Sequence, residues 1–347
     1  MRKFDCIIWA NDFSHNQGEG ILARKFLRDY IKLNPKEIIK VKTFHQEFFV
    51  DKKLFKKKVI IKKNFFYNYF TFIYGIYYLY SNRKKKIIYL NYLPLWNFLL
   101  FLFLPRKVIL GPITGGVQVN NFNNLENILR KLFFPIFYRI SLFIIFKKYK
   151  KVIFSTFLLK KYIKKDYISS CLLGYVYNIF LRQKKFNSKA NNKKKFDIIF
   201  YNRNYSSKRS KHIRNILNYM ANNIKVCVIG DKYINKNFYN YGYVNHNQAL
   251  RLIGKSKLAF GSGENITSLF AIDSYNCGTK LIYDKRLLSE NFISKINSIP
   301  IKFEDILSST GIIRKSLLDY KFKRDDNFCN FLKKKKKEIN FFLKDYL

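Results

Sequence analysis

Short apolar runs alternate with longer amphipathic stretches along this chain, and the alternation limits the possible folds more than any other feature. In the first half the runs end at Trp9, Val41, Leu90, Leu110, Phe154 and Leu173. In the second half they cover residues 196–201, 224–229, 257–260 and 280–283. Alternating strands and helices indicate parallel sheets with helices on both faces. The sequence therefore predicts an α/β protein made of two doubly wound, Rossmann-like domains.

A polar segment separates the two halves of the chain. Residues 182–195 are basic and rich in asparagine, a composition that is typical of a linker. We expect an N-terminal domain at 1–181, a second domain at 196–330, and a basic C-terminal helix at 331–347 that packs back on the first domain. Because doubly wound domains bind ligands at the carboxyl ends of their strands, we expect the ligand site in a cleft between the domains.

The balance of charge is strongly basic. The 347 residues include 67 Lys and Arg against 22 Asp and Glu, which gives a formal net charge of +45. Lys, Asn, Ile, Phe and Tyr are enriched together, so an AT-rich genome explains the excess as well as an acidic partner does. The charge is spread along the chain and no RRM, KH or zinc-finger pattern occurs, so we expect no nucleic-acid partner.

Several basic residues lie next to strongly apolar, aromatic segments. Lys147, Lys148, Lys150 and Lys151 follow the apolar residues 132–146. This pattern favours an anionic membrane surface as a partner, since each basic residue near anionic lipid contributes about 1 kcal/mol. Core helices with flanking lysines would give the same pattern, and this alternative stays open. No run reaches the roughly 20 apolar residues that a membrane span needs.

The N-terminal residues bear on the compartment of the protein, and the cysteines and histidines bear on its cofactors. The first five residues lack the apolar region of a secretory signal, so we expect a cytoplasmic protein that can also lie peripherally on the inner face of the cytoplasmic membrane. The five cysteines are widely separated and only four histidines occur, which predicts neither a disulfide framework nor a zinc site. No Asp-x-Asp motif occurs, and we expect no metal and no other cofactor.

Two glycine-rich loops follow predicted strands in the first half. Gly18 and Gly20 open the helix after the first strand, and Gly115 lies in the loop at 111–116. Glycine lets backbone N–H groups approach a phosphate or a sugar closely, and a helix N-terminus favours an anion. Ordinary turns contain the same residues, so each loop alone is a weak indication of a binding site.

Two further loops follow strands in the second half. Arg203 and Lys208 lie in the first of them, where two cations can hold a diphosphate. The second carries Glu264, and Asp273 lies in the helix that follows it, whose start Thr267 or Ser268 can cap. Carboxylates suit sugar hydroxyls. In a chain with 67 basic residues, chance placement of the two cations is the competing interpretation.

The order of these loops resembles the retaining family 4, or group 1, glycosyltransferases of the GT-B fold. Arg203 and Lys208 stand at the spacing of that family's Arg and Lys, and residues 241–258 resemble the segment before its Glu-x7-Glu element. Asp273 aligns with the second Glu of the element. Glu264 lies nine positions before Asp273 instead of eight, so Asn265 occupies the strict register. Asn91 stands where many members have a histidine.

The resemblance implies roles for these residues. Arg203 and Lys208 would neutralise the donor diphosphate, Asp273 would bind the ribose, and Glu264 would lie by the donor sugar. Further substrate contacts are implied for the remaining residues of the four loops: Gly18, Gly20, Gly115, Asn265 and Thr267. His45, His212 and His246 show no pattern of partners that suggests catalysis.

The implied reaction is transfer of a glycosyl group, with retention and without a metal, from a nucleotide-sugar donor to a hydroxyl of a glycan or lipid-linked acceptor. Synthesis of bacterial surface polysaccharide, O-antigen (the lipopolysaccharide side chain) or glycolipid is the implied setting. The altered carboxylate spacing leaves a second interpretation open. In that interpretation the chain is a catalytically degenerate member that acts as a scaffold or binds a glycan or lipid.

Overall fold

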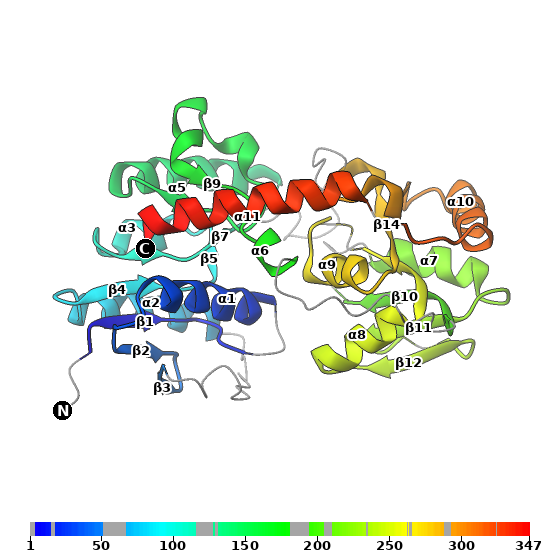
Figure 1. The fold of residues 1–347 in the computed structure, drawn as a ribbon, viewed down its shortest axis with the longest axis horizontal. Coiled ribbons are helices and arrows are strands. Elements are labelled where there is room, and N and C mark those ends of the chain that lie inside the picture. The colour runs from blue at the N-terminus through cyan, green and yellow to red at the C-terminus, as the bar shows by residue number, and fades with distance from the viewer. Residues whose placement is uncertain are drawn as a thin grey trace. The chain divides into compact units, whose positions relative to one another are not determined.

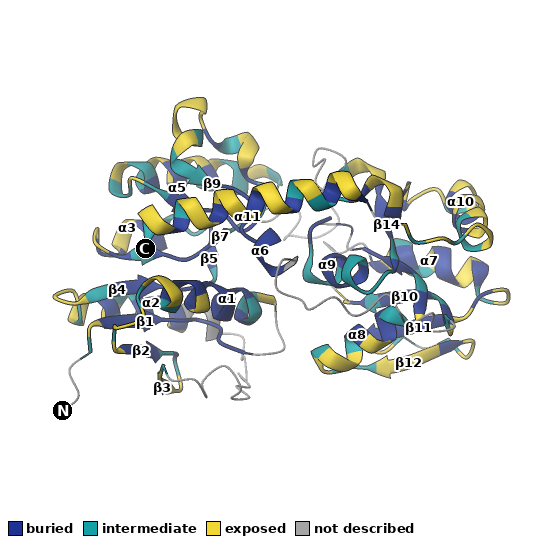
Figure 2. Ribbon diagram, viewed as in Figure 1, coloured by how far each residue is buried: buried dark blue, intermediate teal, exposed yellow. Residues whose placement is uncertain are grey.

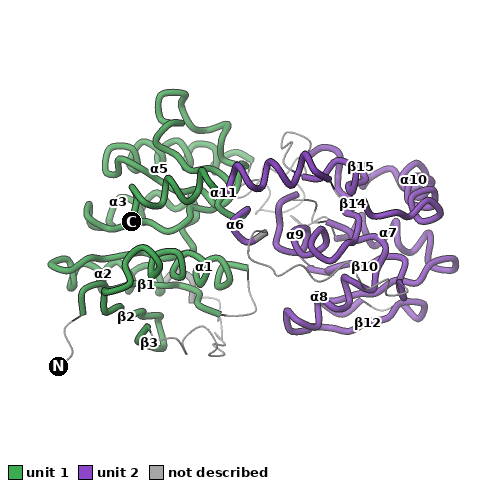
Figure 3. The backbone as a smooth tube through the Cα atoms, in the orientation of Figure 1, with its two compact units in different colours: residues 1–176, 337–347 green, residues 177–336 purple. Residues whose placement is uncertain are grey.

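The computed structural model describes the chain in two compact units. Unit 1 consists of Met1–Val176 and Lys337–Leu347, and unit 2 is Tyr177–Lys336 (Figure 3). The expected linker at 182–195 lies outside the described residues except for Lys194 and Lys195. The described residues are 4–14, 18–50, 67–115, 128, 131–180, 194–204, 210–233, 235–261, 263, 266–287, 293–323 and 325–347.

Unit 1 contains a five-stranded sheet with the order β3-β2-β1-β4-β6 (Figure 1). Strand β1 pairs in parallel with β2 and β4, and only the edge strand β3 runs antiparallel to its neighbour. Every residue of β1 is buried, as expected for a central parallel strand that helices cover on both faces. The strands are β1 (Cys6–Trp9), β2 (Ile39–Lys42), β3 (Glu47–Phe49), β4 (Lys86–Tyr89) and β6 (Ile109–Leu110).

Alternate residues of β1 face different helices. Ile7 and Trp9 share a core with α2, α3 and α5, whereas Cys6 interacts with Tyr30 of α1. Successive side chains of a strand point to opposite faces, so α1 covers one face of the sheet and the other three helices cover the opposite face. These helices are α1 (Gly18–Leu33), α2 (Tyr67–Ser81), α3 (Phe98–Phe103) and α5 (Phe134–Lys148).

Smaller elements complete unit 1. Two short parallel pairs, β5 with β7 and β8 with β9, lie outside the main sheet. Their bounds are β5 (Leu93–Pro94), β7 (Ile113–Thr114), β8 (Val152–Ile153) and β9 (Cys171–Leu172), with the 3-10 turns Lys160–Tyr162 and Lys165–Ser170 before β9.

Unit 2 contains a six-stranded parallel sheet with the order β12-β11-β10-β13-β14-β15. The chain builds outward from β10 first to one side and then to the other, which is the doubly wound pattern. The strands are β10 (Phe196–Asn202), β11 (Val226–Gly230), β12 (Phe238–Gly242), β13 (Ser256–Phe260), β14 (Lys280–Asp284) and β15 (Ser298–Ile301).

Helices cover both faces of the second sheet. Ile198 and Phe200 of β10 pack with α7 and α10, whereas Ile199 packs with α8. The helices are α6 (Tyr177–Phe180), α7 (Ser210–Met220), α8 (His246–Gly254), α9 (Leu269–Asn276) and α10 (Ile306–Leu318), with 3-10 turns at Lys285–Leu287 and Lys295–Asn297. The parallel sheets confirm the α/β class that the alternation of apolar runs predicts.

The C-terminal helix α11 (Asp326–Tyr346) begins before the expected position at residue 331. Its last residues belong to unit 1, where Tyr346 Oη donates to the Leu110 carbonyl at 2.6 Å and Lys151 Nζ lies 2.9 Å from Asp345 Oδ2. Burial raises the pKa of Tyr346. Figure 2 shows buried and exposed residues alternating along this helix, which is the pattern of an amphipathic helix.

No helix among the described residues is both long enough and apolar enough to cross a membrane.

Candidate nucleotide-sugar site

The loop after β10 holds the predicted cation Arg203. Its guanidinium carbon lies 5.2 Å from the centre of the Tyr201 ring, and its side chain is exposed. Lys208, the second predicted cation, lies outside the described residues. Arg203 therefore stands at the carboxyl end of the central strand, where a doubly wound sheet binds its ligand.

Asp231 organises this strand end. Its carboxylate accepts a hydrogen bond from the Asn204 amide at 2.6 Å and another from the Tyr243 hydroxyl. The bond from Tyr243 is the main cause that holds the pKa of Asp231 below its ordinary value, and the charge of Arg203 acts in the same direction. The same bond raises the pKa of Tyr243 to about 12. An ionised Asp231 thus fixes the loop that carries Arg203.

Asn202, the last residue of β10, is buried at the same place. Its Nδ2 donates to the Asp231 carbonyl at 2.9 Å, while its Oδ1 is buried without a hydrogen-bond partner among the described residues. The side chain of Asn202 therefore links the ends of β10 and β11, a role that glycine cannot fill.

The unit that follows β13 carries the predicted carboxylates. Glu264 and Asn265 lie outside the described residues. Helix α9 begins after Ser268, whose Oγ accepts a hydrogen bond from the Ala271 amide at 3.3 Å. Of the two residues that could cap the helix, Ser268 does so, and Thr267 is buried beside it.

Asp273 is buried in α9 and contacts a histidine from the neighbouring helix. Its Oδ2 accepts a hydrogen bond from His246 Nε2 at 3.0 Å. This bond raises the pKa of His246, and burial opposes the effect. Spacing in the sequence did not reveal this partner, because the two residues are 27 positions apart and meet only where α8 packs on α9.

The two helices are also joined at their C-terminal ends. Lys194 Nζ donates to the carbonyls of Gly254 and Gly278, at 2.9 and 3.1 Å. Gly254 is the last residue of α8, and Gly278 follows the C-cap residue Cys277 of α9. Backbone carbonyls at helix C-termini lack partners within the helix. Lys194 therefore joins the C-terminal ends of α8 and α9.

We expect the His246–Asp273 pair to make stability depend on pH. A histidine whose pKa is raised on folding contributes stability fully below its unfolded pKa, about 6.5, and loses the contribution as pH rises through the folded pKa. Urea unfolding should therefore show a larger difference between wild type and His246→Gln at about pH 5 than at about pH 9.

His45→Gln is the matched control, because His45 is exposed in unit 1 and its replacement should leave the pH profile unchanged. Equal destabilisation by His246→Gln at both pH values would contradict the charged pair.

The first glycine loop packs tightly in unit 1. A Cβ on Gly20 would lie 2.1 Å from the Ser14 carbonyl oxygen, so close packing explains this glycine without a ligand. Gly18 is exposed at the start of α1. Asn91 Nδ2 donates to the carbonyls of Asp12 and Glu19, at 2.7 and 3.2 Å, and so joins the loop to the helix. Asn91 thus serves the structure of the loop.

Gly115 also has a packing reason to be glycine. A Cβ there would lie 2.4 Å from Leu159 Cδ2. The rest of its loop, from Gly116 onward, lies outside the described residues. Ligand binding by Gly18, Gly20 and Gly115 remains a prediction.

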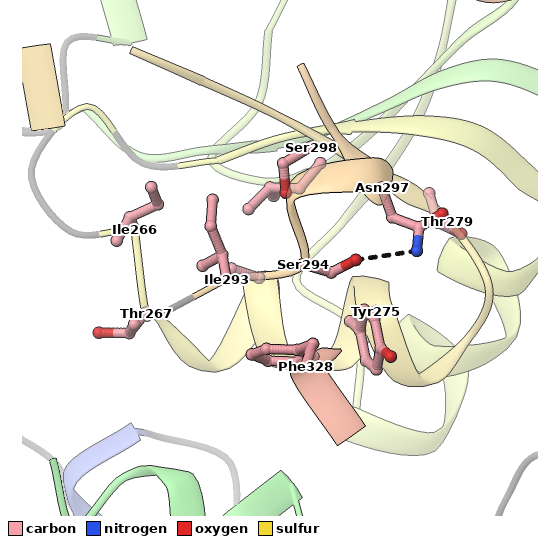
Figure 4. Close-up of a pocket in the computed structure, with 11 residues that line it drawn as sticks. Ile266, Thr267, Tyr275, Thr279, Ile293, Ser294, Asn297, Ser298 and Phe328 are labelled. Carbon is pink, nitrogen blue, oxygen red and sulfur yellow. Dashed lines mark hydrogen bonds between the residues drawn. The ribbon is translucent and has the colours of Figure 1, made fainter. Parts of the chain in front are cut away.

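A small cavity lies beside α9 in unit 2 (Figure 4). Its volume of about 20 Å³ has room for one water molecule. On one side Asn297 Nδ2 donates to Ser294 Oγ at 2.9 Å, and Ser294 Oγ donates to Asp325 Oδ2 at 2.8 Å. The described residues contain no cluster of His, Cys, Asp and Glu that could hold a metal ion.

Comparison with known proteins adds information at the level of the fold. No family model matches the sequence, and no curated protein matches it. Among solved structures, the sucrose-phosphate synthase of Thermosynechococcus elongatus is 12% identical, with 92% of each chain covered and a TM-score of 0.59. The lipopolysaccharide outer core galactosyltransferase WaaB, in its apo form, is 11% identical, with 99% of each chain covered and a TM-score of 0.53.

The chain has the GT-B fold. The fold predicted from the order of the strands and loops is therefore confirmed. The UDP-GlcNAc 2-epimerase of Methanocaldococcus jannaschii, solved with UDP-GlcNAc and UDP, is also similar, at 10% identity, a TM-score of 0.51, and coverage of 92% of this chain and 94% of that one. Because the GT-B fold serves transferases and an epimerase, the residues of the site must indicate the reaction.

Proposed function

We propose that the protein is a glycosyltransferase that moves a sugar from a nucleotide-sugar donor to an acceptor hydroxyl. One observation carries the proposal. In unit 2, Arg203 follows the central strand β10, and the buried Asp273 lies in the helix that follows the adjacent strand β13. A cation suits a diphosphate and a carboxylate suits ribose hydroxyls, so the segments that follow β10 and β13 would supply the two kinds of group that a nucleoside diphosphate requires.

The roles of the residues follow from this placement and from the resemblance to family 4 transferases. Arg203 and Lys208 would stabilise negative charge on the leaving nucleoside diphosphate, and preorganised cations act most strongly as that charge develops. Asp273 would bind the ribose, with His246 positioning its carboxylate. Glu264, Asn265 and Thr267 would lie near the donor sugar, and Gly18, Gly20 and Gly115 would offer backbone N–H groups.

The same proposal covers the stereochemistry of the reaction, its metal requirement and its acceptor. We expect retention of anomeric configuration and no need for a metal, since cations of the chain would take the place of a metal at the diphosphate. The proposed acceptor is a glycan or lipid-linked hydroxyl in the synthesis of surface polysaccharide, lipopolysaccharide or glycolipid. The similarity to a lipopolysaccharide galactosyltransferase supports this setting.

The similarity to a UDP-GlcNAc 2-epimerase supports a second candidate activity. An epimerase changes a UDP-sugar without any acceptor, whereas a transferase joins the sugar to one. A transferase therefore consumes the nucleotide sugar only when an acceptor is present, whereas an epimerase converts it without one.

The test is a calorimetric titration of the full chain with a panel of nucleoside diphosphates and nucleotide sugars, followed by product analysis with the donor that binds. Binding of one nucleoside diphosphate, and release of it that depends on an added glycan or lipid acceptor, would support the transferase. An epimeric nucleotide sugar formed without acceptor would support the epimerase. A folded protein that binds no nucleotide would leave the scaffold interpretation.

A further inference from the structure

Three helices of unit 1 expose apolar side chains where soluble helices are ordinarily polar. On α5, Tyr138, Leu142 and Ile145 point into the core, while Ile140 and Phe143 are exposed, Phe143 by 61%. A helix that is apolar all round is typical of a fully buried element or of contact with lipid. The outer side of α5 is apolar but exposed, so no part of the described chain packs against it.

The same pattern occurs on α2 and α3. In α2, Ile73 and Tyr77 are exposed by 67% and 69%, and they lie four positions apart on one side of the helix. Helix α3 neighbours both α2 and α5, and all three cover the same face of the sheet. The exposed apolar residues of this three-helix face are Phe70, Ile73, Tyr74, Tyr77, Tyr80, Leu99, Leu102, Phe103, Leu132, Phe133, Ile136, Ile140 and Phe143.

Each of the three helices has exposed basic residues at or just after its C-terminal end. They are Arg83, Lys84 and Lys85 for α2, Arg106 and Lys107 for α3, and Lys147 and Lys150 for α5. Residues 67–115 and 131–165 contain no Asp or Glu. The three-helix face is therefore mainly apolar in its middle, where Arg139 of α5 is also exposed, and basic at its edge. Its own segments carry no acidic residue to neutralise these charges.

The lysines near the end of α5 do not all point outward. Lys148 Nζ donates to the carbonyls of Phe101, Leu102 and Leu104, at 2.8, 2.5 and 3.1 Å, and so closes the end of α3. Lys151 pairs with Asp345. By contrast Lys147 is exposed, with its Nζ 4.4 Å from the centre of the Phe143 ring. Two of the four lysines thus serve the fold, and Lys147 and Lys150 remain for a partner.

We propose that the three-helix face of unit 1 docks on an anionic membrane surface, with its aromatic and aliphatic side chains in the headgroup region and its basic edge on anionic lipid. Tyr and Phe beside Lys and Arg are the residues that such interfacial helices use. A second copy of the chain would bring two basic edges together, which disfavours self-association. The proposal does not depend on the transferase activity.

The experiment is flotation of the full chain with vesicles of phosphatidylcholine alone or mixed with phosphatidylglycerol. Wild type should float only with the anionic vesicles. Arg106→Gln with Lys107→Gln should weaken binding about thirtyfold, and Ile140→Ser with Phe143→Ser about a hundredfold. Exposed pairs in unit 2 are the matched controls: Arg314→Gln with Lys315→Gln, and Ile312→Ser with Leu318→Ser on α10.

Controls that retain wild-type flotation, together with losses in both face variants, would support the assignment. The assignment would be overturned if wild type does not float, or if the unit 2 controls lose binding equally. It would also be overturned by a dimer in solution that the Ile140→Ser and Phe143→Ser changes dissociate. The charge variant alters only exposed residues, so it keeps the test valid if the apolar variant folds poorly. Nucleotide titration of the same variants tests the transferase proposal separately, because nucleotide binding is measured without vesicles.

Discussion

Arg203→Ala should abolish measurable nucleotide binding or weaken it by about tenfold to a hundredfold, since a hydrogen bond to a charged group contributes about 1.5 to 3 kcal/mol. The rate of transfer should fall further, by about a hundredfold to a thousandfold, because the cation meets most charge in the transition state. The side chain is exposed, so the fold should be unchanged. Calorimetry with the preferred nucleoside diphosphate measures the first effect, and donor turnover measures the second.

Two variants make this result specific. Arg203→Lys keeps the charge but loses the planar fork, so it should retain part of the binding. Arg251→Ala removes an exposed cation from α8 and should bind as wild type does. Unchanged affinity in Arg203→Ala would show that the diphosphate does not bind at the end of β10. An equal loss of affinity in Arg251→Ala would show that the effect comes from net charge and not from this position.

Gly230→Ala should destabilise unit 2 by about 3 to 5 kcal/mol, because left-handed strain and overpacking add at one position. Gly230 has a φ of +95°, and a Cβ there would lie 2.3 Å from the Asn202 carbonyl oxygen and 2.6 Å from the Tyr201 ring. One of these neighbours is backbone and cannot rotate away. Urea unfolding monitored by circular dichroism measures the loss.

Gly242→Ala is a matched control in the same sheet. Gly242 also has a positive φ, of +63°, but nothing lies within 4 Å of a Cβ there. Only the strain remains, so its cost should be about 1 kcal/mol. If both variants lose the same stability, crowding between β10 and β11 is not the cause.

Much of the fold could be predicted from local pattern. Buried parallel strands must be short and apolar, and helices between them must carry an apolar stripe, so runs such as that ending at Trp9 mark β1 directly. The start of α9 was also predictable, because Ser268 is a residue type that caps helices. These features depend on residues close together in the chain.

The candidate site could be predicted only in part. The positions of Arg203 and Asp273 after their strands follow from the strand pattern. The bond between His246 and Asp273 does not, since it requires α8 and α9 to pack side by side. Likewise, the glycine at position 20 suggested a ligand loop, yet Ser14 lies where a side chain would have to be.

The sequence by itself determined the α/β class, the order of strands and helices, and which loops carry cations and carboxylates, because each of these depends on periodicity and residue type within a short window. Only the tertiary structure decided which distant residues meet. It paired His246 with Asp273, turned Lys148 into the cap of α3, and left the outer side of α5 exposed. Such contacts depend on how helices pack across a sheet, and helical periodicity does not encode that packing.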